Sequence, residues 1–333
     1  MNLNKMFVPA ANVATGIINS RARLNTGTHC NYKCPFCYYI DSLDDVKPFN
    51  DILKDIEFIK ESNINEIDLS GGESSIHNRW FDILDACSSF DNISTLSNGS
   101  MFQDIEFLKK SQKHGLNEIL FSLHGWDSIS HDKSVGHVGA FKDIMQSIKN
   151  ANMLNIIVRI NCTVSMNFEP VAYYTLINSL KIKQLNLLPL NYWGVGHQKV
   201  IDYNVVSRKI HTVIDNVSKS LNINVRYIPF CYMRGYEKYT VGTYQHIYDL
   251  KDWNFCTWNN LSNNKMTSYE QGLLRRDSYT KPKDCLSCKH LFICDGVENK
   301  LIDTFIPLPE DGQKIKNIME YRNGIINFNT NTQ

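Results

Sequence analysis

The sequence predicts an α/β fold, a partial (β/α)6 barrel of the TIM type followed by a small cysteine-rich domain. Three observations lead to this prediction. Short apolar runs alternate with amphipathic stretches from about residue 22 to residue 221, the alternation stops there, and five of the ten cysteines lie beyond it. Strand–helix units in series predict a parallel sheet with right-handed crossovers.

Each expected strand is a short apolar run, and each precedes a stretch of helical periodicity. The strands are expected at 22–27, 66–70, 92–97, 118–124, 156–164 and 184–190. The helices are expected at 50–62, 78–90, 103–115, 139–154, 170–181 and 205–221. In the first helix, Ile52, Ile56 and Ile59 form one apolar stripe that can pack on a sheet. Polar residues recur where the strands end, which favours a barrel over an open doubly wound sheet.

The chain divides into four expected parts. Residues 1–21 form an N-terminal lead-in segment before the barrel, and residues 22–221 form the barrel. Residues 222–322 form the cysteine-rich domain, and residues 323–333 form a flexible tail. A domain with so small an apolar core needs a metal or another cross-link to stabilise it.

Composition limits the possible partners. Thirty-five basic and 34 acidic residues leave a formal net charge of +1, which creates no long-range field to attract nucleic acid or an anionic membrane. No run approaches the roughly 18 apolar residues that a membrane span needs, and the N-terminus lacks a signal-peptide core. We therefore expect a cytoplasmic protein with neither nucleic acid nor membrane as a partner.

Three cysteines crowd together directly after the first expected strand. Cys30, Cys34 and Cys37 have the spacing C-x3-C-x2-C. Thiolates are soft ligands that suit iron–sulfur clusters or zinc. A four-iron cluster takes one ligand per iron, so three cysteines leave one iron open to a small molecule. A zinc site completed by His29 or a distant cysteine is the alternative.

This motif, with Phe36 in its aromatic position, resembles the C-x3-C-x-aromatic-C signature of the radical SAM superfamily, and the resemblance extends over about residues 22–200. It implies that Cys30, Cys34 and Cys37 ligate a [4Fe-4S] cluster whose open iron binds S-adenosylmethionine (SAM). An electron from the cluster would split SAM into methionine and a 5′-deoxyadenosyl radical, which takes a hydrogen atom from the substrate. The resemblance also implies an electron donor such as a flavodoxin or ferredoxin.

The resemblance further implies which residues at the strand ends contact SAM. In the family a GGE segment meets the SAM amino group, which would make Glu73 an acceptor. An arginine such as Arg159 can hold a carboxylate by two parallel hydrogen bonds. Ordinary turns remain the alternative for the glycines and for Asn98. The expected SAM contacts are Phe36, Gly71, Gly72, Glu73, Asn98, Ser122, Arg159, Asn161 and Leu188. No catalytic residue beyond the cluster is assigned.

A second group of cysteines resembles the SPASM and shorter twitch domains, which carry auxiliary iron–sulfur clusters on many radical SAM enzymes. The longer SPASM pattern continues with a cysteine where this chain has Glu298, so one auxiliary [4Fe-4S] cluster is expected. Four of five candidates would hold it, and Cys231 is slightly favoured over Cys256 because it follows a further expected strand. A structural zinc is the alternative. The five candidates are Cys231, Cys256, Cys285, Cys288 and Cys294.

The leading functional hypothesis is a radical SAM enzyme that modifies a peptide, as in the maturation of ribosomally made peptides. The alternative is the same chemistry on a small metabolite, such as a sugar, aminoglycoside or nucleotide precursor. A hypothesis from another class is a non-enzymatic iron–sulfur or zinc protein. A plain electron carrier does not need a six-unit barrel with a polar rim, so this last hypothesis ranks below the others.

Overall fold

The structure is built around one ten-stranded sheet. The computed structural model describes residues 21–37, 39–61, 65–190, 201–241, 253–257, 265–267 and 279–315. The strand order is β10-β9-β1-β2-β3-β4-β5-β6-β7-β8, and adjacent strands are parallel except β9 with β10. The strands of this sheet are β1 (Arg21–Asn25), β2 (Glu66–Ser70), β3 (Asn92–Ser97), β4 (Leu116–Ser122), β5 (Ile157–Val164), β6 (Gln184–Pro189), β7 (Asn222–Arg226), β8 (Thr240–Val241), β9 (Trp253–Thr257) and β10 (Lys265–Thr267).

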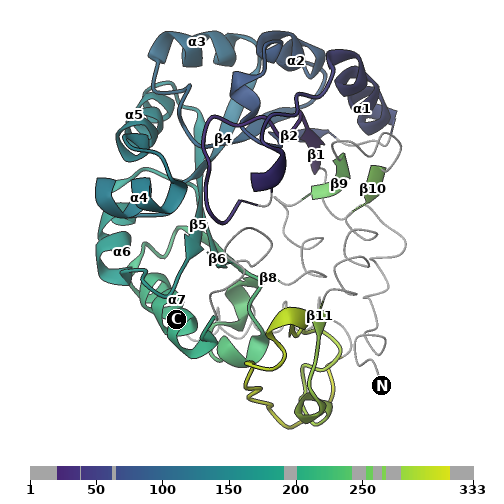
Figure 1. Ribbon diagram of the computed structural model, residues 1–333, viewed down its shortest axis with the longest axis vertical. Coiled ribbons are helices and arrows are strands. Elements are labelled where there is room, and N and C mark those ends of the chain that lie inside the picture. Colours follow the sequence, from purple (N-terminus) through teal and green to yellow (C-terminus); the bar gives the residue numbers. More distant parts are fainter. Residues whose placement is uncertain are drawn as a thin grey trace.

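The helices form the outer layer, and the strands line the inner curve of the molecule (Figure 1). The helices are α1 (Phe49–Glu61), α2 (Trp80–Ala86), α3 (Ile105–Lys113), α4 (Ser128–Val135), α5 (Ala140–Met153), α6 (Pro170–Ser179) and α7 (Tyr203–Asn216). Helix α1 buries the predicted stripe of Ile52, Ile56 and Ile59 against the core. Each such buried side chain contributes about 1.5–3 kcal/mol of hydrophobic stabilisation. The predicted partial barrel is confirmed.

Helix α4 is an element that the sequence analysis did not predict. It begins with a capping box, in which the Asp127 carboxylate accepts from the Ser130 amide at 2.7 Å and the Ser130 hydroxyl accepts from the Asp127 amide at 3.1 Å. It ends at Gly136, whose φ of +66° suits a residue without a side chain. Its buried residues are His131 and Val135, which is too few for an apolar period to indicate a helix.

The sheet continues past residue 221 at both of its edges. At one edge β7 pairs with β6 and β8 pairs with β7. At the other edge β9 pairs with β1, where Cys256 lies opposite Arg23. The chain from β7 onward therefore extends the barrel sheet on both sides.

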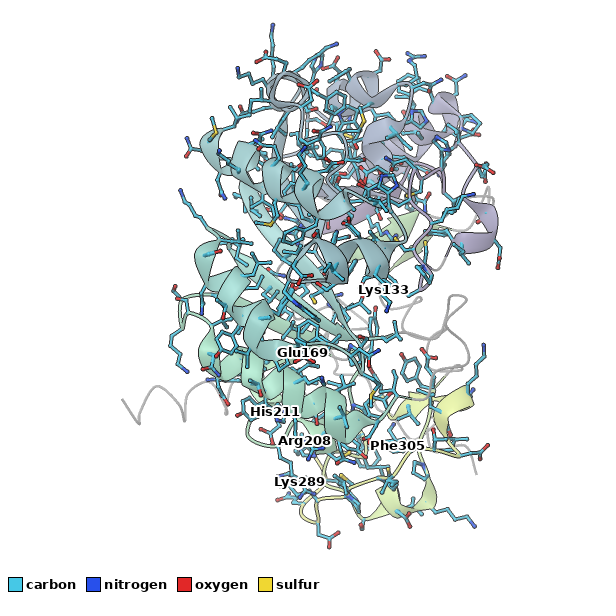
Figure 2. All side chains as sticks on the ribbon, turned by 60° about the vertical axis from the view of Figure 1, so that its left-hand side comes forward. Lys133, Glu169, Arg208, His211, Lys289 and Phe305 are labelled. Carbon is cyan, nitrogen blue, oxygen red and sulfur yellow. The ribbon has the colours of Figure 1, made fainter. Side chains whose placement is uncertain are left out.

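Residues 279–315 form a small lobe below the sheet in Figure 1. In it β11 (Tyr279–Thr280) pairs with β12 (Val297–Glu298). Phe305, labelled in Figure 2, packs against Tyr203 of α7 with ring centroids 5.9 Å apart. Within the described ranges, no helix has the length and apolar character of a membrane span.

A buried ion network fills the amino-terminal half of the barrel interior. Arg21 Nη1 lies 2.7 Å from Asp68 Oδ1 and 3.1 Å from Glu118 Oε1. Arg159 Nη2 lies 3.1 Å from Asp68 Oδ1, and Arg159 also pairs with Glu118. These four side chains are at most 3% exposed. Because an uncompensated buried charge is costly, each member of the network depends on the others.

Replacing Arg21 by Ala removes one cation and leaves the buried carboxylates of Asp68 and Glu118 undercompensated. We expect a loss of about 3–5 kcal/mol in the free energy of unfolding, measured by urea denaturation. The matched control is Lys54→Ala, which breaks an exposed pair with Asp51 and should cost at most about 1 kcal/mol. A loss for Arg21→Ala no larger than that of the control would contradict the structural role of the network.

Candidate functional site

The loop that carries the first three cysteines follows β1 at the carboxyl end of the parallel strands. The Cys37 amide donates to the Cys34 carbonyl at 2.9 Å, and the Cys30 amide donates to the Leu43 carbonyl at 3.0 Å. Tyr32, only 2% exposed, anchors the loop in a small apolar cluster with residues of α4 and α5. The three cysteines are thus held where barrels place their active sites.

The Gly71–Gly72 segment packs directly on the cysteine loop. The Gly72 amide donates to the Gly27 carbonyl at 2.9 Å, and the Glu73 amide donates to the His29 carbonyl at 2.8 Å. A Cβ on Gly71 would lie 2.0 Å from the Gly27 oxygen, and one on Gly72 would lie 2.1 Å from the His29 oxygen. The two glycines therefore permit a close approach between two stretches of backbone.

The Glu73 carboxylate is buried and accepts hydrogen bonds from its own chain. It accepts from the Ser97 hydroxyl at 3.0 and 3.1 Å, from the Asn98 amide at 2.6 Å, and from both the amide and the hydroxyl of Ser75. Burial raises the pKa of this carboxyl, although the same donors oppose the rise. Asn98 in turn places its side-chain amide 3.9 Å from Cys30 Sγ. Glu73 thus links the end of β3 to the first cysteine.

The three cysteines of this loop are half-buried, and the thiols of Cys30 and Cys37 accept hydrogen bonds from backbone amides. The Tyr32 amide donates to Cys30 Sγ at 3.5 Å, and the Tyr39 amide donates to Cys37 Sγ at 3.3 Å. Burial raises the pKa of Cys30 to about 11 and that of Cys34 to about 12. The free thiols are therefore protonated near neutral pH, and a metal must displace these protons to bind.

Ligand spacing distinguishes a cluster from a single ion. In the part of the chain that the structure describes, no three His, Cys, Asp or Glu side chains are placed to hold one metal ion. One zinc ion draws its ligands onto a single centre. A four-iron cluster instead binds each thiolate through a different iron, so its ligands lie further apart. Three thiolates on one loop can each ligate one iron of such a cluster and leave its fourth iron without a protein ligand.

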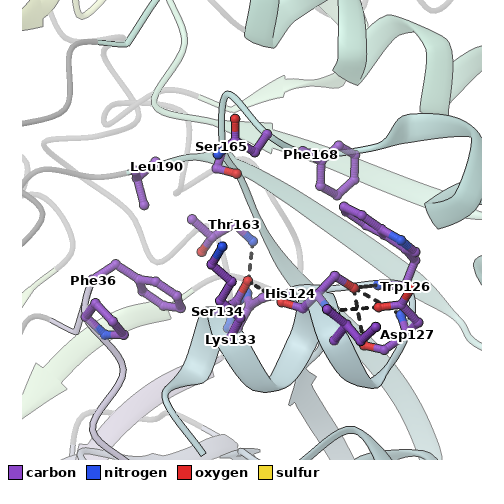
Figure 3. Close-up of a pocket in the computed structure, with 14 residues that line it drawn as sticks. Phe36, His124, Trp126, Asp127, Lys133, Ser134, Thr163, Ser165, Phe168 and Leu190 are labelled. Carbon is purple, nitrogen blue, oxygen red and sulfur yellow. Dashed lines mark hydrogen bonds between the residues drawn. The ribbon is translucent and has the colours of Figure 1, made fainter.

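A pocket of about 550 Å³ opens beside the cysteine loop. Phe36 and Leu190 lie on one side of it, and Trp126 and Phe168 lie on the other (Figure 3). This combination of apolar walls with a few polar groups is typical of small-molecule sites. The polar side chains around it are His124, Asp127, Ser130, Lys133, Ser134, Thr163, Ser165 and Asn167.

His124 is a neutral hydrogen-bonding group in the wall of this pocket. Its Nδ1 accepts from the Thr163 amide at 3.0 Å, so the ring proton resides on Nε2. Its ring meets Phe36 edge-on, with centroids 4.9 Å apart. Burial, together with the neighbouring His131, lowers the pKa of His124 to about 3. The side chain therefore stays uncharged across the physiological range.

Residues 24–171 match the Radical SAM superfamily. This match contains the cysteine loop, the glycine segment and the first strands of the barrel. This segment of the chain is a radical SAM domain. Members of that superfamily use SAM and a [4Fe-4S] cluster.

Curated relatives match part of the chain. A probable GTP 3′,8-cyclase of Saccharolobus islandicus is 27% identical over 201 residues, which cover 58% of this chain and 64% of that protein. An S-adenosylmethionine-dependent nucleotide dehydratase, RSAD2 of Siniperca chuatsi, is 24% identical over 186 residues, 51% of each chain. The chain thus spans less than two thirds of the length of these relatives.

Solved radical SAM structures match more of the chain. SuiB of Streptococcus suis bound to precursor peptide SuiA is 16% identical, with a TM-score of 0.63 over 91% of this chain and 76% of that one. The structure of anSMEcpe with bound AdoMet and Cp18Cys peptide is 13% identical, with a TM-score of 0.56 over 94% of this chain and 99% of that one. At these identities the similarity establishes the shared fold.

The remaining expected SAM contacts fall into different environments. Ser122, at the end of β4, and Asn161, opposite it in β5, are half-buried near the pocket end of the strands. Asn161 accepts from the Asn186 side chain at 2.8 Å. Leu188 pairs with Thr163 in the sheet, and Leu190, two residues later, lines the pocket.

Arg159 requires a correction to its expected role. Its guanidinium pairs with Asp68 and Glu118 in the amino-terminal half of the barrel. These two side chains occupy the guanidinium that was expected to bind the carboxylate of a ligand. The Glu73 carboxylate is similarly occupied by protein donors. The pocket side chains of Trp126, Ser130, Lys133 and Ser134 did not emerge from the sequence because they belong to α4 or its lead-in.

A second group of four cysteines meets in the C-terminal lobe. They line a small cavity together with Lys281 and His290. Burial raises the pKa of Cys231 and of Cys285 to about 12, and the neighbouring cysteines add to this rise. The four are Cys231, Cys285, Cys288 and Cys294.

The fifth candidate, Cys256, belongs to a different part of the sheet. Its backbone lies in β9, which pairs with β1, whereas Cys231 follows β7 near the opposite edge. The structure therefore groups Cys231 with the three C-terminal cysteines. Sequence spacing did not decide between the two because both lie far from the C-x2-C-x5-C segment along the chain.

The low pKa of His124 predicts an acid-sensitive stability. Between pH 6.5 and about 3 the unfolded chain binds a proton at His124 that the folded chain does not bind, so the free energy of unfolding falls as the pH is lowered through this range. Its slope can reach about 1.4 kcal/mol per pH unit for one such group. His124→Asn should reduce the slope measured by urea denaturation between pH 5 and 6.5. An unchanged slope would contradict the assignment.

Proposed function

We propose that this protein is a radical SAM enzyme that modifies a peptide. The observation that carries the proposal is the extent of the fold match: structures with bound peptides align over more than nine tenths of this chain, including its C-terminal part. An exposed apolar side chain at the pocket supports it. Ile129 lines the pocket and is 79% exposed. Such a side chain can contact a ligand that extends beyond the pocket.

The first three cysteines have the properties that a SAM-binding cluster requires. Cys30, Cys34 and Cys37 would hold the [4Fe-4S] cluster and leave one iron without a protein ligand. When bound, the cluster and SAM supply the 5′-deoxyadenosyl radical. His29 Nδ1, beside Cys30, is buried and has no hydrogen-bond partner among the described residues, as expected of a group next to a missing ligand. A flavodoxin or ferredoxin would supply the electron in the cytoplasm.

The 550 Å³ pocket would hold the adenosyl end of SAM and the reacting part of the substrate. Phe36 and Leu190 offer apolar surface for an aromatic base. His124 offers an Nε2–H donor whose availability does not change with pH in the physiological range. Gly71, Gly72 and Glu73 act on SAM by fixing the cysteine loop, and Asn98 and Ser122 remain proposed contacts at the strand ends.

We propose that the second cysteine group holds an auxiliary [4Fe-4S] cluster. The four thiols around one cavity supply one ligand for each iron. The C-terminal lobe would then correspond to a twitch-like domain, because one four-cysteine set is sufficient.

A nucleotide is the second candidate substrate. The curated relatives are named for GTP or a nucleotide, and Lys133 in the pocket wall could pair with a phosphate. Their match covers little more than half of this chain, however, so the peptide hypothesis accounts for more of the fold.

Replacing Cys30, Cys34 and Cys37 together by Ala should remove the SAM-binding cluster and keep the auxiliary one. After anaerobic reconstitution we expect about eight irons per wild-type chain and about four in the variant, with formation of 5′-deoxyadenosine abolished. The control is Cys87→Ala, which removes a buried core thiol and should leave both readouts unchanged. Equal iron in wild type and triple variant would disprove this ligand assignment.

The substrate class can be tested with two probes, GTP and a synthetic peptide encoded by a short reading frame next to the gene. With SAM and dithionite present, we expect the peptide to change in mass and to increase 5′-deoxyadenosine formation over the substrate-free control. GTP should do neither. Conversion of GTP without any change in the peptide would favour the nucleotide hypothesis.

A further inference from the structure

A buried lysine lies against the second group of cysteines. Lys281 is only 6% exposed and lines the same cavity as Cys231, Cys285, Cys288 and Cys294. Its positive charge acts on both Cys285 and Cys294. Lys281 thus places a cation in the wall of the cavity where four thiolates would hold a cluster.

The backbone around Lys281 is built for close contact with the cysteines. Gly296 has a φ of +81°, and a Cβ there would lie 2.2 Å from the Thr280 oxygen and 2.8 Å from Lys281 Cγ. The Gly296 amide donates to Cys294 Sγ at 3.4 Å. The absence of a side chain at Gly296 therefore lets β11, with Lys281 beside it, approach the Cys294 turn.

Other groups at this cavity are neutral donors or weaker charges. His290 is 1% exposed, and burial lowers its pKa to about 4, so it contributes no charge at neutral pH. Backbone amides of Phe230 and Leu308 donate to Cys294 and Cys231. The carboxylates of Asp284 and Asp295 oppose Lys281. Asp284 is exposed to solvent, which screens it, whereas Asp295 is half-buried and acts on Cys294 less strongly than Lys281 does.

We propose that Lys281 compensates the charge of a closed, four-thiolate [4Fe-4S] cluster and stabilises its reduced form. This inference rests on the proposed auxiliary cluster. Four thiolates give the oxidised cluster a net charge of −2, and uptake of one electron makes it −3. A cation held in a water-poor cavity favours the more negative state. Because every iron has a cysteine ligand, the second site is suited to electron uptake and not to chelation of substrate.

The test uses the Cys30, Cys34 and Cys37 triple Ala variant, so that only the auxiliary cluster contributes. Redox titration with dithionite, followed by electron paramagnetic resonance, gives the midpoint potential. We expect Lys281→Met to shift it to a more negative value and Lys281→Arg to keep it close to the parent. Lys283→Met, at an exposed lysine nearby, is the matched control and should cause no comparable shift.

Iron content separates the possible failures. If the parent binds no iron at this site, the proposed auxiliary cluster is wrong. If Lys281→Met keeps about four irons with an unchanged potential, the cluster stands and the role of Lys281 is wrong. Loss of iron from Lys281→Met but not from Lys281→Arg supports charge compensation, whereas loss from both overturns it.

The closed ligand set has its own readout. Imidazole added to the parent should leave the spectrum of the reduced cluster unchanged, because no iron is open to it. In Cys231→Ala, imidazole should alter the spectrum at the iron that has lost its thiolate. A spectral change of the parent itself would show an open iron and overturn the closed site.

Discussion

The contact between the cysteine loop and the Gly71–Gly72 segment positions the rest of the active site. Two backbones meet there with no side chain between them, and the hydrogen bonds of Gly72 and Glu73 fix the loop relative to β2. From Glu73 the same connection continues to Asn98 and then to Cys30. These contacts fix the position of Cys30 relative to the sheet, and Cys30 is one of the three ligands of the proposed SAM-binding cluster.

The electrostatic environment inside the barrel differs between the two ends of the strands. In the amino-terminal half, Arg21 and Arg159 are paired with Asp68 and Glu118, so the charges of the protein compensate one another. At the carboxyl end, the pocket contains the neutral His124, several hydroxyls and aromatic walls. Two side chains of opposite formal charge, Asp127 and Lys133, also line this pocket.

The sequence allowed the six strand–helix units to be predicted to within a few residues, because their apolar periods reflect burial directly. It also located the first cysteine motif, whose members are close together along the chain. The helix α4 was missed because it buries only two residues, and the pocket residues on it were missed with it. Alternation identified Arg159 as an interior residue, but it could not tell which half of the barrel the side chain faces.

The sequence also could not predict contacts that depend on the order of the strands in the sheet. Cys231 and Cys256 are equally plausible partners by composition, and only the pairing of β9 with β1 moves Cys256 to the other edge of the sheet. The Glu73 carboxylate likewise accepts hydrogen bonds from Ser97 and Asn98, which lie at the end of the neighbouring strand β3.

The strands at the two edges of the sheet limit which parts of this chain could be removed or exchanged. Residues that follow the six predicted units supply β7 and β8 at one margin and β9 and β10 at the other. Truncation after residue 221 would expose unpaired backbone hydrogen-bonding groups at both edges of the remaining sheet. Exposed strand edges promote aggregation. The cysteine-rich part therefore cannot be exchanged by itself. Chimeras between enzymes would also have to include the strands at both edges of the sheet.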